Sequence, residues 1–143
     1  MDYPTGGATF QLSTKNSISS EKPLDDDIKV FLFQAVRELL INVVKHAQAK
    51  SVSISIQKEN TRIRIYVEDD GVGFIPLSND FSQDKHKGFG LFSIRKRLNY
   101  LGGSLEIKSQ PGHGTKITIL SPLRVKKRKS NGKNISKRDN VIR

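Results

Sequence analysis

The sequence contains no cysteine, no tryptophan and no long apolar run, and these absences exclude whole classes of protein. Without cysteine there is no disulfide framework and no cysteine-based metal site. No apolar stretch approaches the roughly 18 residues that a transmembrane helix needs, and no cleavable signal stands out. The 143 residues, of which 35% are hydrophobic, suffice for one soluble globular domain, which we expect in the cytoplasm.

Acidic residues are also scarce, with 14 Asp and Glu against 25 Lys and Arg, a formal charge of +11. Residues 124–143 hold nine Lys or Arg and one acid, which leaves +3 for residues 1–123. We therefore expect a domain over 1–123, flexible over 1–8, and a disordered basic tail over 124–143. The tail is either a solvated extension or a contact for nucleic acid, an anionic membrane or an acidic partner. Because the domain itself is near neutral, nucleic-acid binding is not the leading hypothesis.

Hydrophobic periodicity predicts two long helices and five strands. One helix follows the acids at 25–27 and runs to Ala47, and a second runs from Leu91 to Leu101, where two glycines end it. Alternating residues predict strands at 52–56, 63–67, 105–108 and 116–120, and an edge strand at 8–13. This order favours an α/β sandwich with a largely antiparallel sheet covered on one face.

Polar residues on the first predicted helix form one stripe, because Glu38, Asn42 and Lys45 are spaced i, i+4, i+7. A carboxylate, an amide and an ammonium at the edge of a buried face could meet a metal ion and phosphates. A helix flank that simply faces water explains the same pattern.

An Asp-x-Gly-x-Gly pattern closes the strand at 63–67, with Asp69, Gly71 and Gly73. A buried Asp at a strand end can accept a hydrogen bond from an exocyclic amine, and glycines let the backbone approach a flat ligand. Asp-Gly is also an ordinary turn, so the pattern alone decides little.

Two further segments are candidates for ligand contact. Gly88 and Gly90 open the second helix after the basic Lys87, and free backbone N–H groups at a helix N-terminus bind anions. A glycine-rich hinge without a ligand is the alternative. The segment 111–115 is most simply a turn, in which Thr115 is the one candidate for ligand contact.

These elements, in this order and at this spacing, make the chain resemble the catalytic ATP-binding domain of sensor histidine kinases. That domain belongs to the superfamily of gyrase, heat-shock chaperone, histidine kinase and MutL ATPases. The resemblance runs from about Phe10 to Pro122, and the ending Asn-x-x-Lys-His-Ala favours the nitrate-sensor-like branch. The segments that carry it are RELLINVVKHA (37–47), DDGVGF (69–74), GFGLFSIRKRL (88–98) and GGSLEIKSQPGHGTKITILSP (102–122).

The resemblance implies the Bergerat fold, a two-layer α/β sandwich whose mostly antiparallel, mixed sheet is covered on one face by about three helices. ATP is expected between the helices and the sheet, under a lid over residues 75–87. On the adenine side, Asp69 would accept a hydrogen bond from the base amine, Gly71 and Gly73 would allow contact with the ring, and Thr115 would support the base.

On the phosphate side, the resemblance implies that Asn42 holds Mg²⁺ and that Glu38 orients the metal through water or acts as a base. Mg²⁺ prefers oxygen ligands and keeps several waters, which suits one amide plus phosphate oxygens. The residues expected near the phosphates are Lys45, His46, Lys87, Gly88, Gly90 and Leu91.

The three histidines do not match the phosphoacceptor of a complete kinase, because His46, His86 and His113 fall in the helix end, the lid and a turn. We therefore expect a histidine kinase catalytic domain that does not autophosphorylate alone. It would pass the γ-phosphoryl group to a histidine on a separate dimerisation domain, and a response regulator would receive it from there. A monomer is expected in isolation, and the domain could also be the cytoplasmic part of a membrane-bound sensor.

Three alternatives stay open for the function. An anti-sigma-factor-like serine kinase shares the fold but differs around the asparagine segment. A nucleotide-gated interaction module would bind ATP without turnover. A stand-alone ATPase like gyrase or MutL needs additional domains and is the least favoured.

Overall fold

The computed structural model of the chain describes residues 9–16, 22–76 and 89–125. The elements within these ranges follow the predicted order. They are β1 (Thr9–Asn16), α1 (Asp26–Asn42), the π-helical turn η1 (Val43–Ala47), β2 (Ser51–Lys58), β3 (Arg62–Asp69), α2 (Phe89–Leu101), β4 (Ser104–Ser109) and β5 (Thr115–Pro122).

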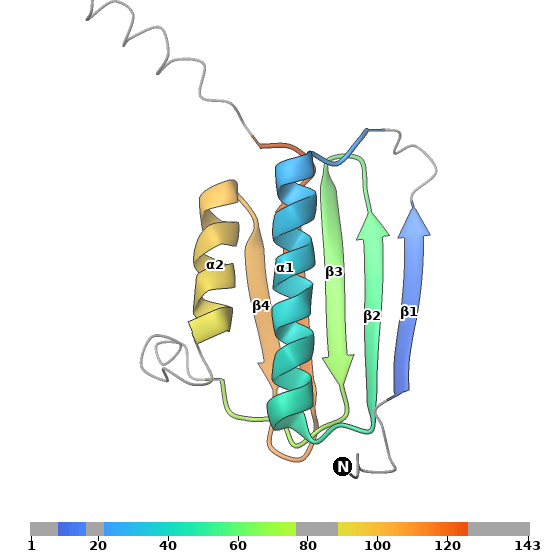
Figure 1. The fold of residues 1–143 in the computed structure, drawn as a ribbon, viewed down its shortest axis with the longest axis vertical. Helices are drawn as coiled ribbons and strands as arrows, with labels where there is room; N and C mark the ends of the chain where they lie inside the picture. The colour runs from blue at the N-terminus through green and yellow to red at the C-terminus, as the bar shows by residue number, and fades with distance from the viewer. Residues whose placement is uncertain (1–8, 17–21, 77–88, 126–143) are drawn as a thin grey trace, which may run out of the picture.

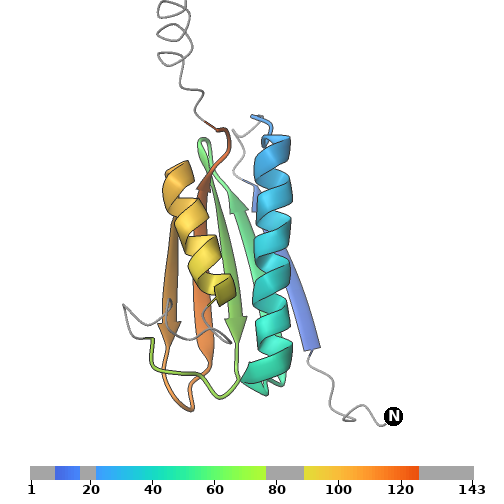
Figure 2. The same cartoon turned by 60° about the vertical axis from the view of Figure 1, so that its left-hand side comes forward.

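The five strands form one mixed sheet in the order β1-β2-β3-β5-β4. β1 pairs with β2 in parallel, and the other three pairs are antiparallel. Both α-helices lie on the same face of the sheet, as the two views in Figures 1 and 2 show. The predicted α/β sandwich is therefore confirmed. The described part of the chain contains two α-helices, where about three were expected, and η1 continues α1 without a break.

Alternation along the strands explains why one face of the sheet takes the helices. On β3 the side chains of Ile63, Ile65 and Val67 are buried, while Arg64 and Tyr66 between them are half-buried on the other face. β5 repeats the pattern, with Ile117 and Ile119 buried. Successive side chains of a strand point to opposite faces, so these residues give the sheet one apolar side.

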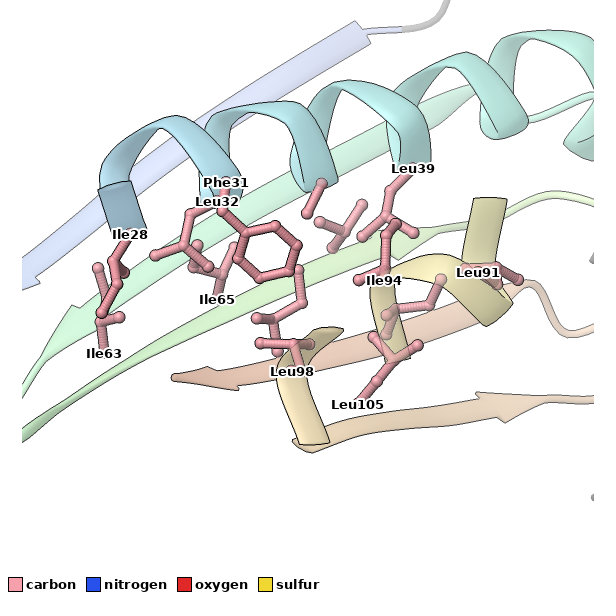
Figure 3. Packing of buried hydrophobic residues seen from close by; sticks show 14 of the residues in the cluster. Ile28, Phe31, Leu32, Leu39, Ile63, Ile65, Leu91, Ile94, Leu98 and Leu105 are labelled. Atoms are coloured by element: carbon pink, nitrogen blue, oxygen red, sulfur yellow. The ribbon is translucent and has the colours of Figure 1, made fainter. Parts of the chain in front are cut away.

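The core lies between this apolar side and the two helices, as Figure 3 shows. Ile28, Phe31, Leu32 and Leu39 of α1 project toward β3, and Leu91, Ile94 and Leu98 of α2 complete the cluster. Each of these side chains is at most 7% exposed. Burying a Leu, Ile or Phe side chain contributes about 1.5–3 kcal/mol, so this cluster is the main stabilising element of the fold.

The residue before α1 is joined to the segment that follows β5. The Asp25 N–H donates to the Leu123 carbonyl, and the Asp25 carboxylate accepts from the Val125 N–H, both at 2.9 Å. Asp25 therefore does not cap α1 through its side chain. None of the helices in the described ranges has the length and apolar character of a membrane-spanning segment.

We predict that Leu98→Ala lowers the free energy of unfolding by about 2–5 kcal/mol, because Leu98 is fully buried and its loss leaves a cavity. Urea denaturation followed by circular dichroism measures the change. Leu12→Ala is the matched control, since Leu12 is 69% exposed and its truncation should change stability by about 0.5 kcal/mol or less. Equal losses in the two variants would contradict the described core.

Candidate functional site

The predicted site residues that the structure describes gather at one end of the sandwich, the lower end in Figure 1. At this end α1 and η1 finish, β3 finishes at Asp69, β5 begins at Thr115, and α2 begins at Phe89. The chain thus brings together segments that are far apart in sequence.

Asp69 is the buried acid of the site, with a side chain that is 7% exposed. Its Oδ1 accepts a hydrogen bond from the Gly71 N–H at 2.9 Å. Burial raises the pKa of Asp69, because desolvation disfavours the carboxylate, and the charge of Asp70 adds to this effect. The backbone N–H groups of Gly71 and Thr115 act in the opposite direction and lower the pKa. A donor from a ligand would further stabilise this desolvated carboxylate.

Asp70, the next residue, has a structural role. Its Oδ1 accepts from the N–H groups of Lys50 and Ser51 at 2.8 and 2.9 Å, and its Oδ2 accepts from the Ser51 hydroxyl at 3.0 Å. These hydrogen bonds, led by that from the Ser51 backbone, lower the pKa of Asp70. The fold therefore shifts the pKa values of the two neighbouring acids in opposite directions. Of the two, only Asp69 is buried.

Thr115 lies directly beside Asp69, because the two residues are partners in the β3–β5 register. Thr115 is 8% exposed, and its Oγ1 lies 2.8 Å from the Ser109 Oγ. The Ser109 hydroxyl donates to the Gly114 carbonyl at 2.9 Å and accepts from the Phe74 N–H at 2.8 Å. Ser109 thus fixes both Thr115 and the backbone that follows Gly73.

Sequence reasoning missed Ser109. The available signal was its place on β4, two residues after Ile107 and four after Leu105, which puts it on the face toward the helices.

Gly71 and Gly73 allow close approach between backbone segments. A Cβ on Gly71 would collide with the Ala47 carbonyl, and the adjacent Val72 N–H donates to that carbonyl at 2.7 Å. Gly73 has a φ of +65°, which disfavours other residues, and a Cβ there would collide with the Gln110 carbonyl. Both glycines therefore have a role in the fold whether or not a flat ligand also contacts them.

Glu38 and Gly90 lie against each other across the two helices. A Cβ on Gly90 would lie 2.6 Å from Glu38 Oε1, so the glycine makes room for the carboxylate. The Leu91 side chain belongs to the core, while its backbone lies in the first turn of α2, where helix N–H groups lack intrahelical partners. The helix that carries Glu38 and the start of α2 at Gly90 are therefore neighbours in space.

Asn42 ends the regular part of α1 as a half-buried residue. Its Nδ2 is buried and has no hydrogen-bond partner within the described ranges. An unpartnered buried amide is rare in proteins and calls for an explanation, and a bound polar ligand is one.

The predicted stripe of Glu38, Asn42 and Lys45 is altered by η1. A π-helical turn is wider than an α-helical turn, so Lys45 and His46 do not keep the angular spacing that a regular helix predicts. Both side chains are exposed, whereas Glu38 and Asn42 are half-buried. The two cations stand at the rim, where long side chains can reach a charged ligand.

Two predicted phosphate contacts, Lys87 and Gly88, lie outside the described residues, as does most of the expected lid over 75–87. Among the residues that are described, no three His, Asp or Glu side chains form a metal-binding group.

A cleft of about 400 Å³ lies against Asp69 and Thr115 on the side of the β4–β5 hairpin. Ser109, His113 and Lys116 also line it, whereas Glu38 and Asn42 do not. The cleft therefore reaches the Asp69–Thr115 end of the sheet, and no residue of α1 lines it.

A sequence model described as "Histidine kinase-, DNA gyrase B-, and HSP90-like ATPase" matches residues 27–125, more than half of the chain. The chain belongs to this family. The matched range of the ATPase family contains α1 except its first residue, α2, four of the five strands and every described site residue. The resemblance drawn from the motifs is thereby confirmed.

Curated relatives indicate which type of ATPase-family domain the chain resembles. The chain is 35% identical over 101 residues to a sensor-like histidine kinase of Chloroflexus aurantiacus, covering 70% of this chain and 17% of that protein. It is 35% identical over 98 residues to the histidine-protein kinase/phosphatase DegS of Brevibacillus brevis, covering 68% and 24%. It is 36% identical over 104 residues to the histidine-protein kinase/phosphatase UhpB of Salmonella typhimurium, covering 73% and 19%. The chain is thus an ATPase-family domain of the sensor histidine kinase type, and it spans about a fifth of the length of these relatives.

The raised pKa of Asp69 predicts how its variant responds to pH. The folded state binds the Asp69 proton more tightly than the unfolded state does. Ionisation of Asp69 therefore lowers the free energy of unfolding as pH rises above the ordinary pKa of 3.8. We expect Asp69→Asn to gain stability relative to the parent with rising pH, up to a plateau above the folded pKa. Urea unfolding at stepped pH measures the difference.

Asp70→Asn is the control for this pH experiment. Because the pKa of Asp70 is lowered in the fold, its contribution is present above its ordinary pKa and is lost as pH falls through the folded value. The Asp70→Asn variant should therefore be less stable than the parent at neutral pH, with a gap that narrows in acid. If the stability difference from the parent changed with pH in the same direction for both variants, the opposite pKa shifts of the two acids would be contradicted.

Proposed function

We propose that this domain binds Mg·ATP and donates the γ-phosphoryl group to a histidine on a separate helical dimerisation domain. The observation that carries the proposal is the desolvated Asp69 carboxylate beside Thr115, in a chain of the ATPase family. The names of the relatives, all histidine kinases, support the choice of a histidine as acceptor.

On the adenine side, Asp69 accepts a hydrogen bond from the exocyclic amine of the base. Thr115 is held by Ser109 and supports the ring through its hydroxyl. Gly71 and Gly73 contact the ring through their backbone, since the direction that a Cβ would take at each is filled by the Ala47 or Gln110 carbonyl. A site with a buried acceptor discriminates strongly against a base that lacks the donor, because the carboxylate would then stay unpaired.

On the phosphate side, Asn42 offers its amide oxygen to Mg²⁺ and its unpartnered Nδ2–H₂ to a phosphate oxygen. Bound Mg²⁺ would neutralise phosphate charge in the transferring group. Glu38, packed against Gly90, orients water around the metal. Lys45, His46 and Lys87 supply positive charge, and the N–H groups of Gly88, Gly90 and Leu91 receive phosphate oxygens at the start of α2.

The transfer itself needs no nucleophile from this chain. A ring nitrogen of the acceptor histidine attacks the γ-phosphorus, the bond from phosphorus to the ADP oxygen breaks, and the imidazole proton passes to solvent. The domain contributes position and charge neutralisation, which are the main sources of catalysis in phosphoryl transfer. His46, His86 and His113 are not assigned as acceptors, so we propose that the domain alone does not phosphorylate itself.

We predict that Asp69→Asn weakens binding of a non-hydrolysable ATP analogue by at least about tenfold, because it removes the charge of a buried acceptor. Isothermal titration calorimetry with Mg²⁺ present measures the affinity. Asp70→Asn, at the neighbouring structural acid, should leave the affinity within about twofold. Equal weakening in both variants would contradict the assignment of Asp69 to adenine.

Asn42→Ala provides a separate test of the phosphate side. In the parent, Mg²⁺ should increase the affinity for the ATP analogue, and Asn42→Ala should lose this increase. The affinity for the analogue without Mg²⁺ should change less. Asn99→Ala, at an exposed residue on α2, is the matched control and should keep the full Mg²⁺ response.

Phosphoryl transfer distinguishes the kinase from the alternatives. We predict that ³²P passes from ATP to an added dimerisation domain that carries its acceptor histidine, and not to a His→Ala form of that domain. The linkage should be acid-labile, as expected of phosphohistidine. Tight ATP binding without transfer would instead favour a nucleotide-gated interaction module, and acid-stable label on an added antagonist protein would favour a serine kinase.

A further inference from the structure

Large apolar side chains remain exposed on the side of the molecule where α1 and β1 flank β2. Phe10 and Leu12 of β1 are 54% and 69% exposed, and Phe33 and Val44 of the first helix and its π-helical end are each 71% exposed. Single exposed apolar residues are ordinary on soluble proteins. A group of them on neighbouring elements indicates an interaction surface.

The apolar residues of α1 lie on the flank that faces away from α2. On the α2 side, the Arg97 guanidinium carbon lies 5.2 Å from the centre of the Phe31 ring, and Glu38 packs against Gly90. The other flank carries a stripe at helical spacing, formed by Phe33, Val36, Leu40 and Val44. Its half-buried members, Val36 and Leu40, pack against the core. Figure 1 shows β2 and β1 on this side of α1.

β1 extends the same apolar face beyond the helical layer. Its parallel register puts Phe10 beside the fully buried Val52 and Leu12 beside the half-buried Ile54, so these side chains share the face that the helices cover. In Figure 1 no α-helix of the described ranges lies over β1. The helical layer of the described ranges therefore ends at α1, while the apolar side of the sheet continues to the exposed Phe10 and Leu12.

The charge beside this surface favours an acidic occupant. Lys29 is paired with Asp26 at 3.7 Å, whereas the exposed Arg37, and Lys45 next to Val44, form no ion pair within the described residues. Residues 126–143 of this chain contain eight Lys or Arg and one Asp, so they match Arg37 in sign. A second copy packed antiparallel through the same stripe would bring two Arg37 residues together. Both occupants are therefore disfavoured by like-charge repulsion.

We infer that Phe10, Leu12, Phe33, Leu40 and Val44 form a docking surface for an amphipathic helix of a partner protein, with an acidic residue facing Arg37. Such a helix would lie beside α1 at the usual interaxial distance of about 8–10 Å and complete the helical layer. Because the surface lies on the flank of α1 opposite Glu38, its occupant leaves the proposed nucleotide site open.

A synthetic helix tests this docking surface with the whole chain. The probe is a fluorescein-labelled peptide as long as α1, 17 residues, with leucines on one helical stripe and glutamates beside it. Fluorescence anisotropy should show saturable binding, and a scrambled peptide of the same composition should bind at least about tenfold more weakly. Phe33→Glu should also weaken binding at least about tenfold. Tyr100→Glu is the matched control, since Tyr100 is an aromatic residue on α2 that is 80% exposed.

A charge exchange tests the predicted acidic contact. The parent should prefer the glutamate peptide to the same peptide with lysines in place of the glutamates, and Arg37→Glu should reverse this preference. Binding of the ATP analogue should stay unchanged in Phe33→Glu and Arg37→Glu, which separates this inference from the proposed function. Circular dichroism of each variant confirms that it is folded.

Several outcomes would overturn the inference. Equal binding of the patterned and scrambled peptides, or equal losses in Phe33→Glu and Tyr100→Glu, would show that this surface does not recognise a helix. A concentration-dependent dimer in sedimentation equilibrium that Phe33→Glu abolishes would assign the surface to a second copy of the chain.

Discussion

The antiparallel register between β3 and β5 is the constraint on which the candidate site depends. It puts Asp69 beside Thr115 on the face that the helices cover. A slip of one residue would reverse every side chain of β3, expose Ile65 and Val67, and turn Asp70 inward in place of Asp69. The hydrophobic core and the buried carboxylate are therefore set by the same alignment, and the energy of core packing holds the acid in an environment it would not otherwise occupy.

Much of this arrangement could be predicted from the sequence, because it follows from local periodicity. The alternation through Ile63, Ile65 and Val67 predicts a strand and, continued by two residues, an inward Asp69. The helical spacing from Ile28 onward predicts α1, and motif order led to the ATPase family that the comparison confirms. Where a signal repeats every two or every three to four residues, one sequence suffices to place the element.

The features that escaped prediction depend on contacts between distant segments. The hydroxyl of Ser109 has its role only because the hairpin end meets the backbone at Phe74. The π-helical turn that displaces Lys45 has no signature in the apolar pattern. The close approach of Gly71 and Gly73 to the carbonyls of Ala47 and Gln110 was also not foreseen, while their contact with a ligand stays a prediction. Such roles appear only when the tertiary partners are known.

The parallel pairing of β1 has a consequence for how the domain opens. β1 is one of the two edge strands of the sheet, and α1 separates it in the chain from its one neighbour, β2. The β2–β3 and β4–β5 pairs are local hairpins, whereas β1 must be recruited across a whole helix, at the entropic cost of a long loop. We therefore expect β1 to detach locally more readily than the hairpin strands and to exchange its amide hydrogens faster than they do. A helix bound against Phe10 and Leu12 would slow amide hydrogen exchange in β1. Binding at the surface beside α1 would therefore be measurable as a change in the exchange rate of this one strand.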